Sequence, residues 1–246
     1  YLKNNISDGQ MESLHVIGHR VVHGGEIFHG PKLIDKNVIA EIRNLIPLAP
    51  LHNPANLTGI EIMQQHYPEI PQIAVFDTAF FQTLPAYAYR YALQNDLYQH
   101  HHVRRYGFHG TSHRFVAQQA AKTLGKSLKS LKLITCHLGN GCSIAAINKG
   151  KSVYTSMGFT PLEGLVMSSR CGYIDVAAVF YLMEKEKLSF HEMDSILNRK
   201  SGLLGVSGIS NDMRTIVSSA EKGRRSAKLV LDMFMYRIKK YIGAYI

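Results

Sequence analysis

The sequence predicts an α/β protein built from two domains, and three observations lead to this prediction. Short apolar segments with strand patterning alternate with amphipathic helical segments. The 246 residues exceed an ordinary single domain, and 46% of them are hydrophobic, which is enough to bury a substantial core. Residues 1–79 carry five Lys and Arg against eight Asp and Glu, whereas residues 80–246 carry 23 against 10. We therefore place a boundary just after Asp77, with domains over 1–78 and 79–246.

The first part alternates two strand patterns with two helix patterns. In chain order these are a strand over 15–23, a helix over 36–46, a Pro-bounded loop over 48–54, a helix over 56–67 and a strand over 72–76. Gly24-Gly25 ends the first strand and Pro47 closes the first helix. Asn56 or Thr58 is the expected cap of the second helix.

The second part is predicted to open on helical segments and to continue as a meander of three strands. The expected elements are a helical stretch over 86–94, a polar His-rich turn over 98–105, a helix over 112–124, strands over 131–138, 142–147 and 152–156, helices over 175–187 and 190–199, and an amphipathic helix over the last twenty residues. Tight turns join the three strands, which therefore pair with their sequence neighbours.

Both ends of the chain look cut. The first residue is Tyr1 rather than Met, and the last helical pattern runs to Ile246 without the Gly, Asn or Pro that ordinarily ends a helix. We expect the chain to be a fragment of a longer protein, and this span alone to be inactive.

Composition excludes several classes of protein. No apolar run approaches the roughly 18–20 residues of a membrane helix, and no secretory leader opens the chain. Cys136, Cys142 and Cys171 are odd in number and lack CxxC spacing, so the sequence predicts neither a disulfide framework nor a structural zinc site. A reducing, cytoplasmic location follows, with no membrane partner.

The net charge of +10 raises the question of an anionic partner. A basic chain can bind nucleic acid, an anionic membrane, or a phosphorylated or carboxylate ligand. The basic residues here are dispersed, and the densest clusters are pairs such as Arg104-Arg105 and Arg224-Arg225. This dispersion is more typical of a solvated surface, so we expect no nucleic-acid partner.

Residues 137–141 (HLGNG) form the strongest local signal. A Gly-x-Gly turn after a strand allows positive φ angles and can direct backbone N–H groups at an anion. Taken alone, the segment favours an ordinary hairpin turn, for which Asn-Gly is a common choice.

Arginines and histidines stand beside glycines or apolar residues at four places: Arg20, His52, His109 and Arg170. Each is open to two interpretations, a structural ion pair or an anion-binding group. Metal binding by the histidines is disfavoured, because no HExxH motif occurs and the four-residue spacing of His109 and His113 is common by chance. The sequence therefore assigns no metal ligand.

Two further motifs stay ambiguous when they are considered singly. Asp77 follows an apolar strand, where α/β proteins place catalytic groups, but where an aspartate is also a common helix cap. In residues 207–214 (SGISNDMR), Asp212 either caps a helix or contacts a nucleotide.

Together the segments resemble the acetate kinase family. The resemblance covers essentially the whole chain, in register, and rests on GHRVVHGG (18–25), LAPLHNP (48–54), VFDTAF (75–80), YGFHGTSH (106–113), CHLGNGCS (136–143), TPLEGLVMSSRCGYID (160–175) and SGISNDMR (207–214). It implies part of the actin-like (ribonuclease H-like) two-domain kinase fold, with a substrate-side domain followed by a nucleotide-binding domain. It also implies reversible phosphoryl transfer from ATP to acetate, giving acetyl phosphate.

The resemblance assigns roles residue by residue. The residues implied in catalysis are Asp77, His109, Arg170 and His52. Those implied in acetate binding are Arg20, Val22, Leu51, Phe108 and Pro161. Those implied in nucleotide binding are His137, Leu138, Gly139, Asn140, Gly141, Asp212, Met213 and Arg214. Because acetate is already ionised at neutral pH, we expect Asp77 to orient an arginine or hydrated Mg²⁺ rather than to act as a base.

The resemblance also implies Mg²⁺ as cofactor, with ligands mainly in family segments that this sequence lacks, and a homodimer. Three alternatives stay open: a propionate kinase of the same family, a non-catalytic actin-like nucleotide-binding module, and a degenerate structural paralogue.

Overall fold

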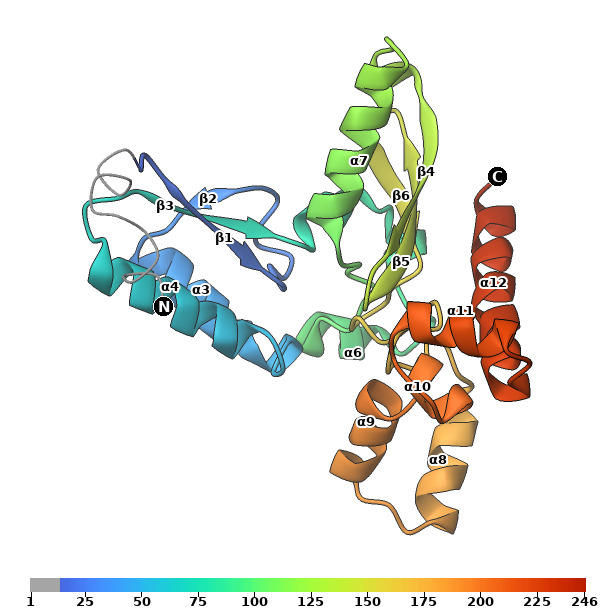
Figure 1. Cartoon of the computed structure of the whole chain (residues 1–246). Coiled ribbons are helices and arrows are strands. Elements are labelled where there is room, and N and C mark those ends of the chain that lie inside the picture. Colours follow the sequence, from blue (N-terminus) through green and yellow to red (C-terminus); the bar gives the residue numbers. More distant parts are fainter. Residues whose placement is uncertain (1–13) are drawn as a thin grey trace. The chain divides into compact units, whose positions relative to one another are not determined.

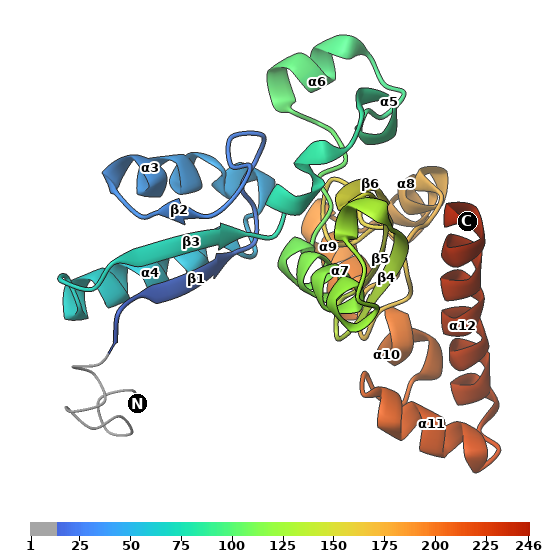
Figure 2. The ribbon, with the colours of Figure 1, turned by 90° about the horizontal axis from the view of Figure 1, so that it is seen from above.

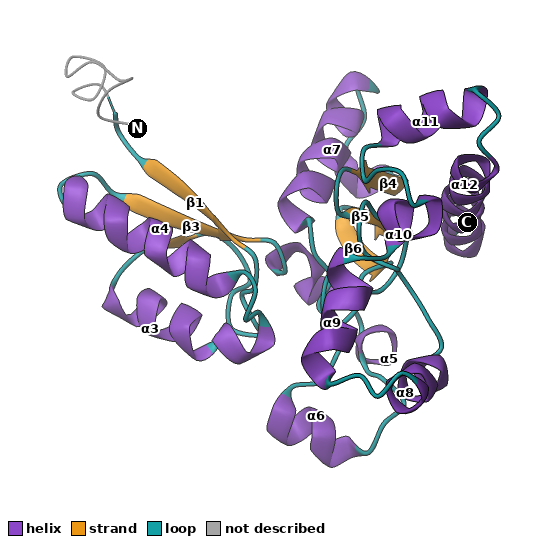
Figure 3. Ribbon diagram, turned by 60° about the horizontal axis from the view of Figure 1, so that its bottom comes forward, coloured by secondary structure: helices purple, strands orange, loops and turns teal. Residues whose placement is uncertain are grey.

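The computed structural model describes residues 14–246, which form two compact units divided between Gln82 and Thr83. Mixed α/β structure fills both units, as the sequence predicts (Figure 3). The division is a property of the packing, and the substrate and nucleotide roles predicted for the two parts stay predictions.

The first unit is a three-stranded sheet covered on one face by two helices (Figure 1). Its strands β1 (Ile17–Val21) and β3 (Gln72–Phe76) run parallel, and β2 (Lys32–Leu33) pairs antiparallel with β3. The helices are α3 (Lys36–Asn44) and α4 (Asn53–His66), with a short 3₁₀ turn at Ile46–Leu48 between them.

Apolar side chains from both layers make the core of this unit. Val21, Ile42 and Ile60 are fully buried, and the rings of Phe28 and Phe76 stack with centroids 4.0 Å apart. Burial of the inward face of each strand fixes the register between β1 and β3, because a slip of one residue would turn Val21 and Phe76 to the other face. The carboxyl ends of both strands consequently lie side by side.

The second unit contains the predicted meander: β4 (Lys132–Leu138), β5 (Cys142–Asn148) and β6 (Lys151–Thr155), paired antiparallel in that order. Helix α7 (Gly110–Thr123) packs along β4 on one side of this sheet, and α12 (Arg225–Tyr245) lies on the other side, against β5 (Figure 2). Strand β5 is buried along nearly all of its length.

The remaining elements of this unit are short helices. They are α5 (Ala86–Tyr89), α6 (Asn95–His101), a 3₁₀ turn at Leu128–Ser130, the neighbouring helices α8 (Val176–Lys185) and α9 (Phe190–Arg199), α10 (Gly202–Ser207) and α11 (Met213–Glu221). Val166, Leu203, Ile216 and Val230 pack the last three helices of the chain together. In the described part of the chain, no helix is both long enough and apolar enough to cross a membrane.

The second helix of the first unit starts earlier than predicted. Helix α4 begins at Asn53, before the predicted caps, because Pro54 sits in its first turn, where a missing N–H costs nothing. Asn56 and Thr58 therefore lie inside the helix. The Asn56 side chain accepts a hydrogen bond from Val22 N instead of capping.

Two predictions near residue 100 are also wrong. The helix expected over 86–94 is confined to Ala86–Tyr89, and the stretch expected to be a polar turn contains α6. That helix ends at His101, and its C-cap residue, His102, has a left-handed φ of 52°. The histidines of this stretch are exposed, so their polarity indicated solvation and not a turn. Strand β2 and helix α10 were not predicted, being only two and six residues long.

Candidate functional site

In the first unit, an arginine and an aspartate meet at the carboxyl ends of the two parallel strands. Arg20 lies opposite Val75 in the register between β1 and β3, and Asp77 directly follows β3. Arg20 Nε lies 3.1 Å from each Asp77 oxygen, and Nη2 donates to Oδ2 at 2.6 Å. Asp77 is 1% exposed, whereas the Arg20 side chain is 61% exposed. The hydrogen bond to Asp77 raises the pKa of Arg20.

The first turn of α4 holds the segment that follows Arg20. Asn56 Oδ1 accepts from Val22 N at 3.0 Å, and Asn53 Oδ1 accepts from His23 N at 3.2 Å. The Asn53 amide also donates to His23 O at 3.1 Å. His52, the N-cap residue of α4, is half-buried and immediately precedes Asn53. Val22 and His52 are thus brought to the same end of this unit.

In the second unit, three histidines gather where α7 begins. His109, at the N-cap of α7, is 9% exposed and has a left-handed φ of 59°. Its ring stacks on that of His137 from β4, with centroids 4.0 Å apart. His113, one turn along α7, is 1% exposed. Burial, and to a smaller extent the neighbouring His137, lowers its pKa to about 4. His113 is therefore neutral near pH 7.

Hydroxyl groups from the sheet link these rings. Ser143 Oγ on β5 lies 2.8 Å from His109 Nδ1 and 2.7 Å from His113 Nε2. Thr135 Oγ1 on β4 lies 2.7 Å from His113 Nδ1. On α7, Ser112 Oγ lies 2.9 Å from His137 Nδ1. Side-chain hydroxyls of the sheet and of α7 are therefore among the hydrogen-bond partners of all three imidazoles.

The loop over 139–141 joins β4 to β5, so the hairpin interpretation of this segment is correct. The expected positive φ angles are not found at Gly139 or Gly141, and close approach of side chains explains these glycines instead. A Cβ at residue 139 would lie 3.2 Å from His137 Nε2. A Cβ at residue 141 would lie 3.1 Å from His109 Nε2 and 3.4 Å from Arg170 Nη1. Two side-chain nitrogens thus converge on the backbone of Gly141.

Arg170 differs from Arg20 in its partners. Its Nη1 donates to Pro161 O at 3.2 Å, and in the described part of the chain no carboxylate pairs with it. Burial lowers the pKa of this guanidinium. The group remains charged, because an arginine pKa lies far above neutrality. Arg170 therefore presents a half-buried charge that is compensated only by a carbonyl dipole.

Beside this loop lies a cavity of about 660 Å³. Its lining includes six residues that the sequence assigned to nucleotide binding: Leu138, Gly139, Asn140, Asp212, Met213 and Arg214. Asp212 caps α11 by accepting from Arg214 N, and it also pairs with Arg214 Nη2 at 2.7 Å. The two interpretations of Asp212 are therefore compatible. A cavity of this size fits a ligand as large as a nucleotide.

Sequence reasoning missed the other residues that line this cavity: Cys142, Met167, Ser168, Leu203, Asn211 and Phe234. Asn211 is adjacent to a predicted residue, but Phe234 belongs to a helix whose amphipathic pattern indicated only a core. Ser168 donates to Asn140 Oδ1 at 3.1 Å and so fixes the loop. No local motif marks that contact.

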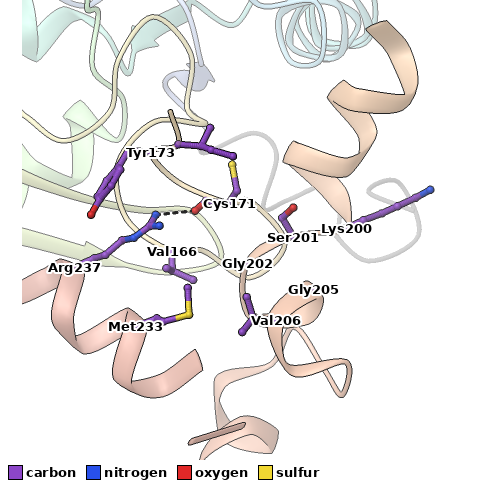
Figure 4. A pocket seen from close by; sticks show the side chains of 11 residues that line it. Val166, Cys171, Tyr173, Lys200, Ser201, Gly202, Gly205, Val206, Met233 and Arg237 are labelled. Atoms are coloured by element: carbon purple, nitrogen blue, oxygen red, sulfur yellow. Dashed lines mark hydrogen bonds between the residues drawn. The ribbon is translucent and has the colours of Figure 1, made fainter. Parts of the chain in front are cut away.

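A second cavity, of about 300 Å³, lies between α10, α12 and the segment before α8 (Figure 4). Arg237, on its wall, donates to Cys171 O at 2.8 Å and stacks over the ring of Tyr173. None of the residues that the sequence assigned to catalysis or binding lines this cavity. The larger cavity is therefore the candidate site.

The described residues do not by themselves fit a resident metal ion. Residues 14–246 contain no group of three or more His, Cys, Asp or Glu side chains arranged to hold one. Both Asp77 oxygens are engaged by Arg20.

The predicted acetate pocket is distributed over both units. Val22 and Leu51 belong to the first unit, where Val22 is half-buried and Leu51 is 51% exposed. Phe108 and Pro161 belong to the second unit, where Phe108 is 1% exposed and Pro161 is half-buried. Their joint role as a pocket stays a prediction.

The sequence profile of the acetokinase family matches residues 1–246. The chain is 55% identical over 236 residues to the acetate kinase of Acetivibrio thermocellus, a match that covers 96% of this chain and 59% of that protein. The chain thus spans about 59% of the length of this relative.

Solved structures show the same similarity. The crystal structure of Porphyromonas gingivalis acetate kinase superposes with a TM-score of 0.91 at 50% identity, covering 95% of this chain and 59% of that one. The crystal structure of a propionate kinase from Francisella tularensis superposes with a TM-score of 0.94 at 47% identity, covering 99% and 62%.

Proposed function

The chain belongs to the acetokinase family, and from that premise we propose that the complete protein transfers the γ-phosphoryl group of ATP to acetate, reversibly, giving ADP and acetyl phosphate. The proposal concerns the complete protein, because the chain spans about 59% of the length of its curated relative.

One observation in the structure carries the proposal. Both segments assigned to the nucleotide line a single cavity, and the loop between β4 and β5 continues from that cavity to Gly141, against which His109 Nε2 and Arg170 Nη1 lie. Phosphoryl transfer needs donors and positive charge around the three equatorial oxygens of the moving group. This arrangement supplies both beside a space for the nucleotide.

In the second unit, Arg170 and His109 act on the transferring phosphoryl group. Arg170 contributes a charge that no carboxylate of the described residues pairs with, and His109 contributes a ring nitrogen that can donate a hydrogen bond. Such donors accelerate the reaction because they are already oriented when charge develops in the transition state. The adenosine contacts of Asp212, Met213 and Arg214 remain part of the proposal.

In the first unit, Arg20 binds the acetate carboxylate and Asp77 positions Arg20. Nε and Nη2 of Arg20 face Asp77, which leaves Nη1 of the exposed guanidinium for an incoming carboxylate. Asp77 acts through this contact, because ionised acetate offers no proton for a base to remove. His52 lies at the same end of the unit and is a further catalytic candidate.

Propionate kinase is the second candidate, favoured by the likeness to the Francisella tularensis structure. Val22, Leu51, Phe108 and Pro161 are proposed to hold the methyl group of the substrate. One additional methylene changes binding by only about 1–3 kcal/mol, so the two acids are best separated by comparing their kcat/KM values.

Three further statements belong to the proposal. Mg²⁺ accompanies the nucleotide, and its ligands are expected mainly outside the residues described here. The complete protein is a homodimer, which the exposed apolar residues Val176, Phe180 and Tyr181 of α8 support. The protein works in the cytoplasm, a location consistent with three free cysteines.

The test is to trap acetyl phosphate with hydroxylamine after mixing the complete protein with ATP, Mg²⁺ and acetate. Hydroxamate formation that requires acetate supports the proposal. Nucleotide binding without hydroxamate from either acid would favour the non-catalytic module instead. The 246-residue span, assayed in parallel, is expected to form no hydroxamate.

A further inference from the structure

Four buried side chains form a continuous hydrogen-bonded line behind the candidate site. Thr135 Oγ1 lies 2.7 Å from His113 Nδ1, His113 Nε2 lies 2.7 Å from Ser143 Oγ, and Ser143 Oγ lies 2.8 Å from His109 Nδ1. Each residue is at most 9% exposed. They come from β4, α7 and β5, which lie side by side (Figure 1).

The number of protons allows three orders along this line. A hydroxyl has one proton to donate, and a neutral imidazole has one N–H. In the first order, Thr135 donates to His113, His113 Nε2–H donates to Ser143, and Ser143 donates to His109 Nδ1. In the second order, all three bonds run the other way. In the third order, Thr135 donates to His113, and Ser143 accepts from both His113 and His109, so that the Ser143 proton needs an acceptor outside the line. His113 carries a single proton near pH 7, because burial lowers its pKa to about 4.

The buried hydroxyls of Thr135 and Ser143 decide between the three orders. In the second order Thr135 accepts from His113 and must donate its own proton elsewhere. Within residues 14–246, the Thr135 hydroxyl has no hydrogen-bond partner other than His113, and the Ser143 hydroxyl has none other than His109 and His113. The second order therefore leaves the Thr135 proton without an acceptor, and the third order leaves the Ser143 proton without one. A buried donor without an acceptor costs about 1–3 kcal/mol. The first order leaves no hydroxyl proton unpaired, and it is therefore favoured.

The favoured order determines what His109 presents to the site. Since Nδ1 accepts from Ser143 in this order, it carries no proton, and the single proton of the ring is on Nε2. His109 Nε2 lies 3.1 Å from the position that a Cβ at residue 141 would take. Arg170 Nη1 lies 3.4 Å from the same position. Both nitrogens facing this point are then donors, as an oxyanion requires.

We propose that Thr135, His113 and Ser143 are positioning residues that order the protons along this line and thereby hold His109 as the neutral Nε2–H tautomer. The inference rests on the proposed function, which makes His109 a donor to the transferring phosphoryl group. If the network only stabilised the fold, the tautomer of His109 would not change when the hydroxyl of Thr135 or Ser143 is removed.

The first test is spectroscopic and needs no turnover. Long-range ¹H–¹⁵N spectra of the imidazoles are recorded for the complete protein at pH 7, with His109 assigned from the His109→Asn variant. We expect Nε2–H for His109 in the native protein and a mixture of tautomers in Ser143→Ala. An Nδ1–H signal in the native protein, or an unchanged spectrum in Ser143→Ala, would overturn the proposal.

The second test is kinetic. Ser143→Ala should lower kcat by about tenfold to a hundredfold, the range found when a supporting hydrogen bond is removed, with KM for acetate and ATP changed less than about twofold. Thr135→Val should lower kcat similarly, and Thr135→Ser, which keeps the hydroxyl, should restore it. The matched control is Ser152→Ala on β6, a fully buried serine that donates to Tyr154 O.

The two readouts separate this inference from the proposed function. Absence of acetate kinase activity in the native protein would overturn the function, while the native spectrum would still test the proton order. Normal kcat in both Ser143→Ala and Thr135→Val, in an active enzyme, would overturn the positioning role. If Ser143→Ala does not fold, the pair Thr135→Val and Thr135→Ser carries both readouts.

Discussion

The two units present their arginines in opposite ways. Arg20 is largely exposed and is held by the buried carboxylate of Asp77 through Nε and Nη2. Arg170 is half-buried and donates only to the carbonyl of Pro161 among its described contacts. The first arginine is neutralised before any ligand arrives, whereas the second is not.

Two arginines of one protein can therefore differ in what they do for an anion: one can orient it, and the other can stabilise its charge. A guanidinium that shares a carboxylate is fixed in direction but attracts an anion less, because the carboxylate opposes the approach. A guanidinium facing only dipoles keeps its full attraction, at the cost of desolvating its charge. Under the proposed function, Arg170 is thus suited to charge that develops in a transition state, and Arg20 to a substrate that needs alignment.

The largest expected effect is that of Arg170→Ala in the complete protein. Removal of an uncompensated donor should lower kcat by about 10²–10³-fold, or about 3–4 kcal/mol of transition-state stabilisation. The free energy of unfolding should stay the same or rise, because a desolvated charge is removed and no carboxylate is left behind. Hydroxamate assays measure the first quantity and urea titrations the second. A marked loss of stability would mean that Arg170 has a structural partner.

Protonation of His113 in the second unit makes the free energy of unfolding depend on pH. The folded-state pKa of His113, about 4, lies below the ordinary value of 6.5, so the unfolded chain binds more protons between these values. Stability contributed by this group is full above about pH 7 and falls as the pH drops from 6.5 toward 4, by about 3 kcal/mol.

Urea unfolding of His113→Gln between pH 7 and pH 4.5 checks this dependence, since the variant should lose less stability on acidification than the native protein. His191→Gln, a change at an exposed histidine of α9, is the matched control and should keep the native dependence. Equal pH dependence in His113→Gln and the native protein would show that His113 is not the responsible group.

Periodicity and turn signals were sufficient to predict most of the fold. The parallel-type strand over 72–76, the three-stranded meander and the long final helix are confirmed because each is a long or strongly patterned segment. The start of α4 was missed because Pro54 was interpreted as a boundary, although proline is also accepted in a first turn. Short elements such as β2 depend on pairing with a distant strand, which no local pattern reveals.

The candidate site was predictable in its motifs but not in its contacts. The segments Leu138–Asn140 and Asp212–Arg214, which the sequence assigned to the nucleotide, line one cavity, and their nucleotide role stays a prediction. The local sequence could not explain why residue 141 is a glycine. The explanation is the close approach of His109 and Arg170, which are distant in sequence. Ser143 and Thr135 escaped notice for the same reason, since a strand hydroxyl has no signal until its partner is known.

In the first unit, Arg20→Ala should affect stability as well as activity. It leaves the buried Asp77 carboxylate without its arginine, which should cost about 1–3 kcal/mol of unfolding free energy. Asp77→Asn in the same chain should restore part of that loss, and urea titrations of the four proteins in this double-mutant cycle measure the coupling. If Arg20→Ala proves as stable as the native protein, the contrast drawn between Arg20 and Arg170 fails.

The smallest effects are expected from one glycine in each unit. A Cβ at Gly24 would lie 2.9 Å from Cβ and Cγ of the buried Phe76, so Gly24→Ala should overpack the core and cost about 1 kcal/mol of stability. A Cβ at Gly141 would press on His109 and Arg170 by a few tenths of an ångström. Gly141→Ala should therefore lower kcat by about fivefold, or about 1 kcal/mol, because the two donors are displaced.

Measured together, the two variants separate packing from positioning. Gly24→Ala is expected to lower the urea midpoint while kcat at saturating substrates stays near its native value. Gly141→Ala is expected to lower kcat while the urea midpoint stays near its native value. If both variants lose stability and neither changes kcat, the close contacts of Gly141 with His109 and Arg170 affect packing only, as those of Gly24 do. The functional contrast between the units would then reduce to the arginines alone.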